Sequence, residues 1–454
     1  MTEATRDNPG ARASSSGSVD AHLGYARRMD RSDGLAHFRR QFHGIPQDSD
    51  AGDGGAGVGD TGGVVAYLDG NSLGRPTRAS LERIQRFLAD AWGGRLIRGW
   101  DEEWMALPFT IGDAIGRAAI GAAPGQTFIG DSTTVTLYKL ARAAVDSQAD
   151  LRGDGPFRTE IVVDTDNFPT DRYVLEGIAR ERGMTLRWIE SDPAGGVTPE
   201  QVAAVVGPQT ALVLLSHVAY RSGFIADVPA ITRIVHKAGA LVLWDLCHSA
   251  GSVPVELDAW GVDLAVGCTY KYLNGGPGSP AFGYVRAELQ DSLAQPIQGW
   301  MGTRDVFMMG PRYVAAYGIR RFVSGTPAIV GMLAMQDTIA MIEQCGIQAV
   351  RDKSVALTEF AIALADEWLA PLGVTVASPR DAAMRGGHVT LSHPAMREVT
   401  ARLWDQDVLP DYRDPGGLRI GLSPLSTSFE ETYRGMAAVR DTLRAELLHR
   451  SGLG

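Results

Sequence analysis

Between residues 110 and 290, short apolar runs alternate with amphipathic stretches, and this pattern restricts the possible folds more than any other feature. One amphipathic stretch is Val228–Ala238, where Ile231, Ile234 and Val235 share a helical face. Strands that are apolar throughout need helices on both faces, so the pattern predicts a mostly parallel α/β sheet. The apolar runs are Ile161–Val163, Ala211–Leu215, Leu241–Trp244, Leu264–Val266 and Phe282–Val285.

The composition favours a large core and argues against several classes of protein. Of the 454 residues, 44% are hydrophobic and 21% charged, and the net charge of -10 is not concentrated in blocks. This balance argues against nucleic acid or an anionic membrane as the partner. The three cysteines, Cys247, Cys268 and Cys345, are far apart and indicate a reducing compartment, with neither a disulfide framework nor a metal site. Because no apolar run reaches the ~20 residues of a membrane helix and no secretory segment is seen, we expect a cytoplasmic protein.

Changes in composition and pattern predict the domain organisation. Residues 1–20 are rich in Ser, Gly and Ala, and we expect a disordered tail there. Residues 21–85 are expected to pack with the small domain and to contain a flexible Gly-rich loop at 51–63. A large domain is predicted over 86–327. It is followed by a smaller α+β domain over 328–454, where longer helical patterns replace the alternation.

Two segments with chemical groups follow predicted strands of the large domain. In LVLWDLCHSAG, Asp245 ends a strand and His248 comes three residues later; in CTYKYLNGGPGSP, Lys271 lies between two tyrosines after the next strand. The carboxyl ends of parallel strands meet at one edge of the sheet, where ligands bind. A carboxylate that keeps a pyridine nitrogen protonated, with a lysine that bonds to the aldehyde, is what pyridoxal phosphate requires. Alone, each residue would be read as a helix cap or a surface lysine; together they predict a cofactor site.

A phosphate site is expected beside the ring. The segment GDSTTVTLYKL at 130–140 places Ser132, Thr133 and Thr134 directly before a helical pattern. The N–H groups and the dipole at a helix start favour an anion, and hydroxyl groups add donors. In isolation the segment would be an ordinary helix cap, but next to Asp245 and Lys271 we interpret it as the phosphate site.

Eight segments, in this order along the chain, resemble the kynureninases. They are YLDGNSLGRPT, DNFPTDRY, LSHVAYRSG, WDLCHSAG, TYKYLNGG, QGWMG, IRRFVSGTP and LRIGLSPL. The resemblance runs from about residue 20 to the C-terminus. It implies the fold of the fold-type I pyridoxal-phosphate enzymes, with a seven-stranded, mostly parallel sheet in the large domain. It also implies hydrolysis of kynurenine to anthranilate and alanine, within tryptophan catabolism by the kynurenine pathway and NAD biosynthesis.

The resemblance also implies roles for single residues. Lys271 matches the lysine that holds the cofactor, Asp245 matches the partner of the ring nitrogen, and Tyr270 is our candidate for moving protons in the last steps. Trp300 and Thr326 match positions that reach the phosphate of the other subunit, which implies a homodimer with shared sites. The whole implied cofactor set is Thr133, Thr134, Phe168, Asp171, Ser216, Asp245, His248, Tyr270, Lys271, Trp300 and Thr326.

For the substrate, the resemblance implies a further set of side chains. Arg419 matches the arginine that clamps the α-carboxylate, where a planar fork suits the task better than lysine. Asn71 and Ser72 in GNSLG are expected near the same substrate. Trp100 in LIRGWDEEW matches a position over the aromatic ring, unless it is simply a core tryptophan. Thr303 replaces a histidine that many relatives have after this GWMG sequence, so any role of that position is in doubt.

Other functions on the same fold stay open at this stage. A cysteine desulfurase or selenocysteine lyase would need a nucleophilic cysteine on a mobile loop, but Cys345 lies in a helical pattern. An aminotransferase is a further alternative, and it would need a keto acid. A non-catalytic binding module of this fold is disfavoured by the joint presence of Lys271, Asp245, Tyr270 and Arg419.

Overall fold

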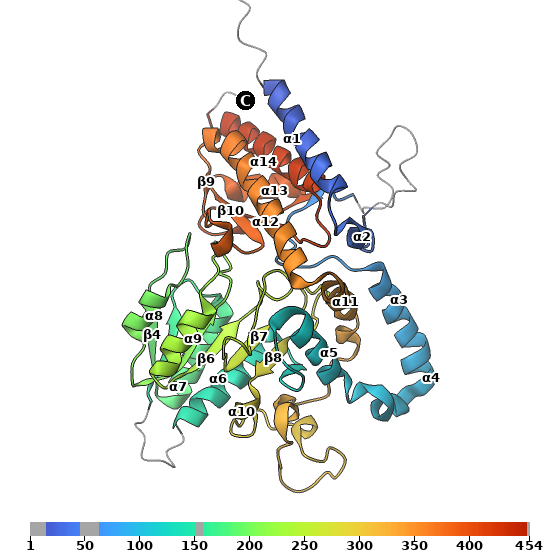
Figure 1. The fold of residues 1–454 in the computed structure, drawn as a ribbon, viewed down its shortest axis with the longest axis vertical. Helices are drawn as coiled ribbons and strands as arrows, with labels where there is room; N and C mark the ends of the chain where they lie inside the picture. Colours follow the sequence, from blue (N-terminus) through green and yellow to red (C-terminus); the bar gives the residue numbers. More distant parts are fainter. Residues whose placement is uncertain (1–14, 46–62, 150–157, 452–454) are drawn as a thin grey trace, which may run out of the picture.

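The large domain contains a seven-stranded sheet with the order β2-β8-β7-β6-β5-β3-β4. Helices such as α6, α7 and α9 surround this sheet (Figure 1). The computed structural model describes residues 15–45, 63–149 and 158–451. Strand β8 alone runs opposite to the other six strands, so the expected mostly parallel sheet is confirmed. The strands are β2 (Thr127–Ile129), β3 (Glu160–Asp164), β4 (Thr185–Ile189), β5 (Thr210–Ser216), β6 (Leu241–Asp245), β7 (Leu264–Gly267) and β8 (Phe282–Val285).

Both faces of the sheet are buried, as the uniformly apolar strands require. On β5, Leu212 and Leu214 pack in one apolar cluster with α6 and α7, whereas Val213 and Leu215 pack in another with α5, α8 and α9. Successive side chains of a strand point to opposite faces, so a strand covered on both sides is apolar at every position. The helices are α5 (Leu107–Ile115), α6 (Thr133–Ala149), α7 (Pro169–Arg182), α8 (Pro199–Val205), α9 (Val228–Lys237) and α10 (Ala287–Gln290).

A second core lies under a four-stranded antiparallel sheet with the order β12-β13-β10-β9. Phe360, Val399 and Met436 bring three helices onto this core. The strands are β9 (Thr375–Val376), β10 (His388–Ser392), β12 (Asp411–Arg413) and β13 (Gly417–Gly421), and the helices are α12 (Ile347–Leu364), α13 (Met396–Trp404) and α14 (Phe429–Arg450).

The N-terminal segment packs against this second core. Helix α1 (Ser15–Arg31) lies along α14 (Figure 1). Strand β1 (Ala66–Tyr67) pairs in parallel with β11 (Val408–Leu409). A short helix, α2 (Ala36–Arg39), follows α1. Ala26 and Leu68 join the second core, as expected for residues 21–85. Phe38, Phe42 and Ile45 instead pack in the cluster of the large domain, so only part of this range packs with the small domain.

Two details differ from the expected organisation. Helix α1 begins at Ser15, so residues 15–20 of the expected disordered tail are helical. Extending a helix that has already nucleated costs little, which explains why it runs into a weakly apolar segment. Residues 1–14 of the tail, and 51–62 of the expected loop, lie outside the described residues.

The domain boundary also shifts in the structure. Helix α11 (Met335–Cys345) packs its apolar side chains, including Ile339 and Ile342, into the same cluster as Ile111 of α5. We therefore propose a boundary near Gly346, between α11 and α12, rather than at residue 328. No helix among the described residues is long and apolar enough to cross a membrane.

Candidate active site

A recess opens at the carboxyl ends of β6 and β7, where ligands of parallel sheets bind. It brings together groups from four segments of the large domain that are far apart in the sequence. The residues around it are Thr133, Thr134, Phe168, Thr170, Asp171, Asp245, Cys247, His248, Tyr270 and Lys271.

Lys271 is the cationic group of this recess, and its side chain is almost fully buried. Its Nζ lies 3.2 Å from His248 Nε2 and 6.0 Å from the centre of the Tyr270 ring. Burial and the charge of Lys271 hold the pKa of His248 well below its usual range, so the imidazole is neutral and can accept a hydrogen bond from the ammonium. Gly74 of the NSLG turn lies against the lysine loop, where a Cβ would stand 2.4 Å from the Lys271 carbonyl oxygen. The tight contact of these two loops therefore requires glycine.

Two carboxyl groups share the floor of the recess. Asp245 ends β6, and its Oδ1 accepts a hydrogen bond of 2.7 Å from the Cys247 N–H; Asp171 comes from the first turn of α7. Burial, and next the charge of Asp245, raise the pKa of Asp171 well above its ordinary value. Asp171 Oδ2 is buried and finds no hydrogen-bond partner within the described parts of the chain. A carboxyl pair in this state fits a ligand that brings a protonated ring nitrogen.

Thr133 and Thr134 form another wall of the recess, at the start of α6. Ser132 caps this helix, because its Oγ accepts the Val135 N–H at 3.4 Å. The first N–H groups of a helix have no partner inside the helix, so together with the hydroxyl groups they suit an anion. This wall would hold a phosphate group, and Asp245 would hold the nitrogen of a pyridine ring.

Phe168 and Ser216 differ in their relation to the recess. Phe168 borders it, and its ring meets Tyr220 edge-on at 5.4 Å. Ser216 at the end of β5 borders a separate small cavity, and its Oγ donates a hydrogen bond of 2.9 Å to Asn167 Oδ1. The same oxygen accepts the Phe168 N–H at 2.7 Å. Ser216 therefore acts on the recess of this chain through Asn167, which holds Phe168.

Arg419 lies on β13 and is buried, and each of the three nitrogen atoms of its guanidinium donates a hydrogen bond. Its Nε donates to Asp411 Oδ2 at 2.7 Å, its Nη1 to the Tyr220 carbonyl at 2.7 Å, and its Nη2 to Ser72 Oγ at 2.8 Å. Asn71 beside it is fully buried, and both of its side-chain polar atoms are without partners among the residues that the structure describes. The structure thus brings together the three residues expected near the substrate α-carboxylate, although residues 71 and 72 and residue 419 lie at opposite ends of the sequence.

Comparison with known proteins assigns the family. The family model for class-V aminotransferases matches residues 152–406. A kynureninase from Pseudomonas fluorescens is 39% identical over 418 residues, which cover 91% of this chain and 94% of that protein. A kynureninase from Burkholderia pseudomallei (strain 1106a) is 40% identical over 424 residues, covering 93% and 95%. This chain belongs to the kynureninase family.

Solved structures that resemble the chain show the same fold. A cysteine desulfurase from Thermococcus onnurineus NA1 has a TM-score of 0.71 at 21% identity, and the match covers 85% of this chain and 96% of that one. The cystine C-S lyase C-DES in complex with cysteine persulfide also has a TM-score of 0.71, at 19% identity, covering 83% and 97%. At such identities the likeness concerns the fold, and the family assignment rests on the kynureninases.

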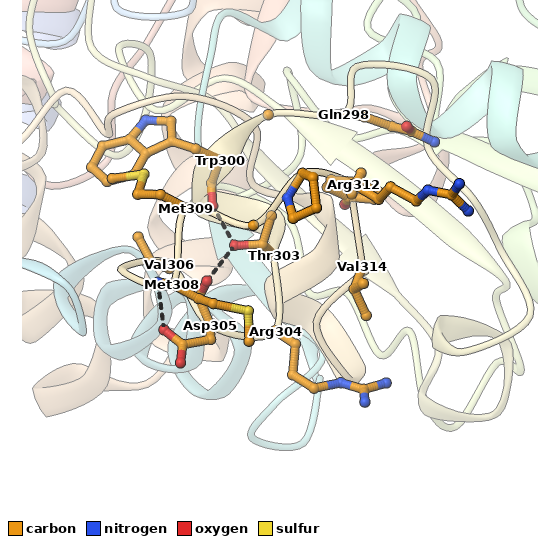
Figure 2. A pocket seen from close by; sticks show the side chains of 14 residues that line it. Gln298, Trp300, Thr303, Arg304, Asp305, Val306, Met308, Met309, Arg312 and Val314 are labelled. Atoms are coloured by element: carbon orange, nitrogen blue, oxygen red, sulfur yellow. Dashed lines mark hydrogen bonds between the residues drawn. The ribbon is translucent and has the colours of Figure 1, made fainter.

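Besides Ser216, Asn71, Ser72 and Arg419, three further residues predicted from the kynureninase resemblance do not line the recess formed by the described residues of one chain. Trp100 packs edge-on against Trp104 at 5.5 Å and joins the apolar clusters, as a core tryptophan would. Thr326 is exposed. Trp300 borders a different hollow of about 530 Å³ on the segment 298–314 (Figure 2). Thr303 on this segment donates to the Trp300 carbonyl at 2.7 Å and so closes a turn, which gives the position a structural role.

The recess also contains residues that we did not predict. Thr170 and Cys247 line it, and both lie inside segments already noted for the kynureninase resemblance. His388 at the start of β10 is fully buried, and its ring lies 5.7 Å from that of His248. The sequence pattern of the large domain could not predict His388, because this residue belongs to the second sheet. Among the described residues, no cluster of His, Cys, Asp or Glu side chains could hold a metal ion.

Proposed function

We infer that this protein is a kynureninase, which uses pyridoxal phosphate to hydrolyse the Cβ–Cγ bond of L-kynurenine and releases anthranilate and L-alanine. One observation carries the proposal: a buried lysine amine faces two buried carboxyl groups and a helix start in a single recess. This set matches the aldehyde, ring nitrogen and phosphate of the cofactor. Among the reactions that pyridoxal phosphate supports, membership of the kynureninase family favours the hydrolysis of kynurenine.

The residues of the recess divide into those that hold the cofactor and those that act on the substrate. Lys271 would hold the cofactor aldehyde, Asp245 with Asp171 the ring nitrogen, and Thr133 with Thr134 the phosphate. When bound, pyridoxal phosphate supplies an electron sink that stabilises negative charge on the carbon atoms next to the substrate amine.

The chain's own groups would then move protons and orient the substrate. Lys271, once free, is placed to take the Cα proton, and neutral His248 at 3.2 Å steadies its amine. Burial raises the pKa of the Tyr270 phenol, so this group stays protonated and can donate a proton as the Cβ–Cγ bond breaks. General acid–base help of this kind contributes about 10²–10⁴-fold. Arg419 with Asn71 and Ser72 would fix the α-carboxylate.

Anthranilate formation tests the proposal directly. Kynurenine is added to the purified protein loaded with pyridoxal phosphate, and we expect anthranilate fluorescence to rise without any added keto acid. Release of sulfide from cysteine with no anthranilate from kynurenine would overturn the proposal in favour of a desulfurase. Dependence on a keto acid would indicate an aminotransferase.

The desulfurase alternative is weakened by the state of the cysteines. Cys345 ends α11, where its Sγ contacts the Ile342 carbonyl oxygen, and burial raises its pKa. Cys247 borders the recess, but a hydrogen bond with Cys268, followed by burial, raises its pKa well above the usual range. A thiol in this state is a poor nucleophile, because the thiolate is the reactive form.

We also propose that two copies of the chain share their active sites. The segment after α10 projects from the large domain (Figure 1) and exposes Phe307, Met308 and Met309, with Met308 71% exposed. Figure 2 shows Trp300, itself 41% exposed, on the same segment. Exposed apolar side chains in such a cluster mark an interaction surface. A second copy would cover it and bring Trp300 and Thr326 to the neighbouring phosphate.

Finer points of function are proposed on the same basis. We propose a cytoplasmic enzyme of tryptophan catabolism and NAD biosynthesis that prefers kynurenine to 3-hydroxykynurenine. Within one chain Trp100 packs against Trp104, so the preference requires the indole also to border the ring pocket once substrate is bound, where it offers no acceptor for the added hydroxyl. The margin should stay below about 10²-fold. Trp100→His should narrow or reverse the ratio of kcat/KM for the two substrates, and an unchanged ratio would leave Trp100 as a core residue.

A further inference from the structure

A second lysine, Lys139, is buried near the recess, and the proposed reaction gives it no role. Its side chain on α6 has no exposed surface, and its Nζ lies 2.8 Å from Asp131 Oδ2 and 5.4 Å from the centre of the Phe128 ring. Burial lowers the pKa of Lys139, and the charge of Asp131 opposes that lowering. An ammonium so deeply buried is costly unless it is paired, so the contact with Asp131 is what keeps it there.

Asp131 lies in the turn that forms the phosphate wall. The turn links β2, which ends at Ile129, to α6, which begins at Thr133. Asp131 has a φ of 55°, in the left-handed region that non-glycine residues avoid. Such a conformation persists only where the surroundings hold it, and it is often found at functional sites.

Hydrogen bonds to the main chain of Gly130 and Asp131 hold this turn in place. The Gly130 N–H donates to the Ala281 carbonyl at 3.0 Å, and the Ala281 N–H donates to the Asp131 carbonyl at 2.9 Å. Thr136 Oγ1 donates to the Gly130 carbonyl at 2.8 Å. These bonds hold the main chain against the strand that begins at Phe282, while Lys139 holds the side chain of Asp131 from the helix.

We propose that Lys139 and Asp131 form a positioning pair that holds this turn in the shape needed to bind the cofactor phosphate. The inference rests on the proposed use of pyridoxal phosphate. Asp131 lies two residues before Thr133, and a lone carboxylate there would repel a phosphate dianion. The ammonium of Lys139 neutralises that carboxylate and fixes its direction. For stability alone, an apolar side chain of similar length would serve as well, because buried ion pairs are often no better than apolar packing.

The test separates phosphate binding from binding of the ring. Lys139→Met keeps the length and apolar body of the side chain but removes its charge. The cofactor is removed from the protein and then pyridoxal phosphate or pyridoxal is added, with the visible absorbance used to obtain each Kd. We expect the Kd for pyridoxal phosphate to rise about tenfold or more, which is the effect of losing one hydrogen bond to a charged group. The Kd for pyridoxal should change less than about twofold.

Lys353→Met is a matched control. Lys353 is also buried, and its Nζ lies 2.6 Å from Asp33 Oδ2, far along the chain from the phosphate wall. In the Lys353→Met variant, the ratio of the Kd for pyridoxal phosphate to the Kd for pyridoxal should equal the ratio in the parent. Should Lys139→Met fail to fold, the double variant Asp131→Asn with Lys139→Met removes both charges and is measured in the same way.

The outcomes are distinct. A rise confined to pyridoxal phosphate supports the positioning pair. Equal losses for both compounds would show a general structural role and overturn it, as would an unchanged Kd for pyridoxal phosphate. A parent protein that binds neither compound would reject the proposed function itself, independently of Lys139.

Discussion

Asp171 and Asp245 place two carboxyl groups in one buried site. This arrangement suits the binding of a ligand but lowers the stability of the cofactor-free protein. Burial and the charge of Asp245 raise the pKa of Asp171. A group whose pKa is raised by folding stabilises the protein below its unfolded pKa, about 4, and that stability is lost as the pH rises toward the folded value. Asp171 Oδ2 has no partner in the described structure, so the ionised carboxylate lowers the stability of the folded protein at neutral pH.

We therefore predict that Asp171→Asn raises the Tm of the cofactor-free protein at pH 7. A gain of ~1 kcal/mol corresponds to about 2–4 °C in domains of this size. The gain should disappear near pH 4, where the parent carboxyl is protonated as well. Thermal unfolding of the two proteins across this pH range checks the prediction, and a lower Tm for the variant at pH 7 would contradict it. In the same variant, affinity for pyridoxal phosphate should fall.

Lys271→Ala should abolish turnover while the recess still binds the cofactor without a covalent bond. The reason is that Thr133, Thr134 and the carboxyl groups hold the other parts of the molecule. Borohydride should fix the cofactor to the parent chain and fail to fix it to the variant. Peptide mapping that finds the label on another lysine would reject Lys271, and retained binding in the variant serves as the control for folding.

Arg419→Lys should lower kcat/KM for kynurenine by about tenfold or more, mainly through KM. A lysine offers one point charge where the planar fork now donates to Asp411, Ser72 and the Tyr220 carbonyl. Hydrogen bonds to a charged group are worth roughly 1.5–3 kcal/mol each. Steady-state kinetics with an accompanying Tm measurement separates loss of binding from loss of folding. An unchanged kcat/KM would place the carboxylate clamp on a different arginine.

Among the elements, the apolar runs that predicted strands fall within β3, β5, β6, β7 and β8 because those strands are buried on both faces. Strand β4 had no such signal, since Thr185, Arg187 and Trp188 at this sheet edge are exposed. Strand β2 is only three residues long. The hydrophobic pattern of the sequence therefore indicates which strands are buried rather than which strands pair. It does not predict edge strands or very short strands.

The active-site groups divide in the same way. Asp245, Lys271 and the start of α6 were predictable, because strand ends and helix starts of one domain meet at one edge of the sheet. Lys139 gave no signal, since a lysine in a helical pattern is usually solvated and only the fold shows that it is buried. The contact between Ser72 and Arg419 depends on how the N-terminal segment packs on the second sheet. The position of His388 beside His248 depends on how the second core docks against the large sheet. No local pattern encodes that docking.

For the whole molecule, the decisive question is whether each recess is completed by a second copy. Trp300 borders a hollow separate from its own recess, on a segment whose Phe307 and Met309 are 61% and 70% exposed. A two-fold dimer places the same patch of each copy against the other, so both sites would gain the same residues. Light scattering should therefore give twice the mass of one chain.

Mixing two inactive variants tests the sharing of sites. Lys271→Ala lacks the lysine, and Trp300→Ala would lack the residue offered to the partner, so each protein alone should be inactive or impaired. In a hybrid dimer, the site that keeps Lys271 lies in the chain with the altered Trp300, and it receives an intact Trp300 from the Lys271→Ala chain. Random co-assembly makes about half of the dimers hybrid, each with one complete site, so about a quarter of the parental activity should return. If co-expression gives no more than the mean of the separate variants, Trp300 serves its own chain and the sharing of sites is wrong.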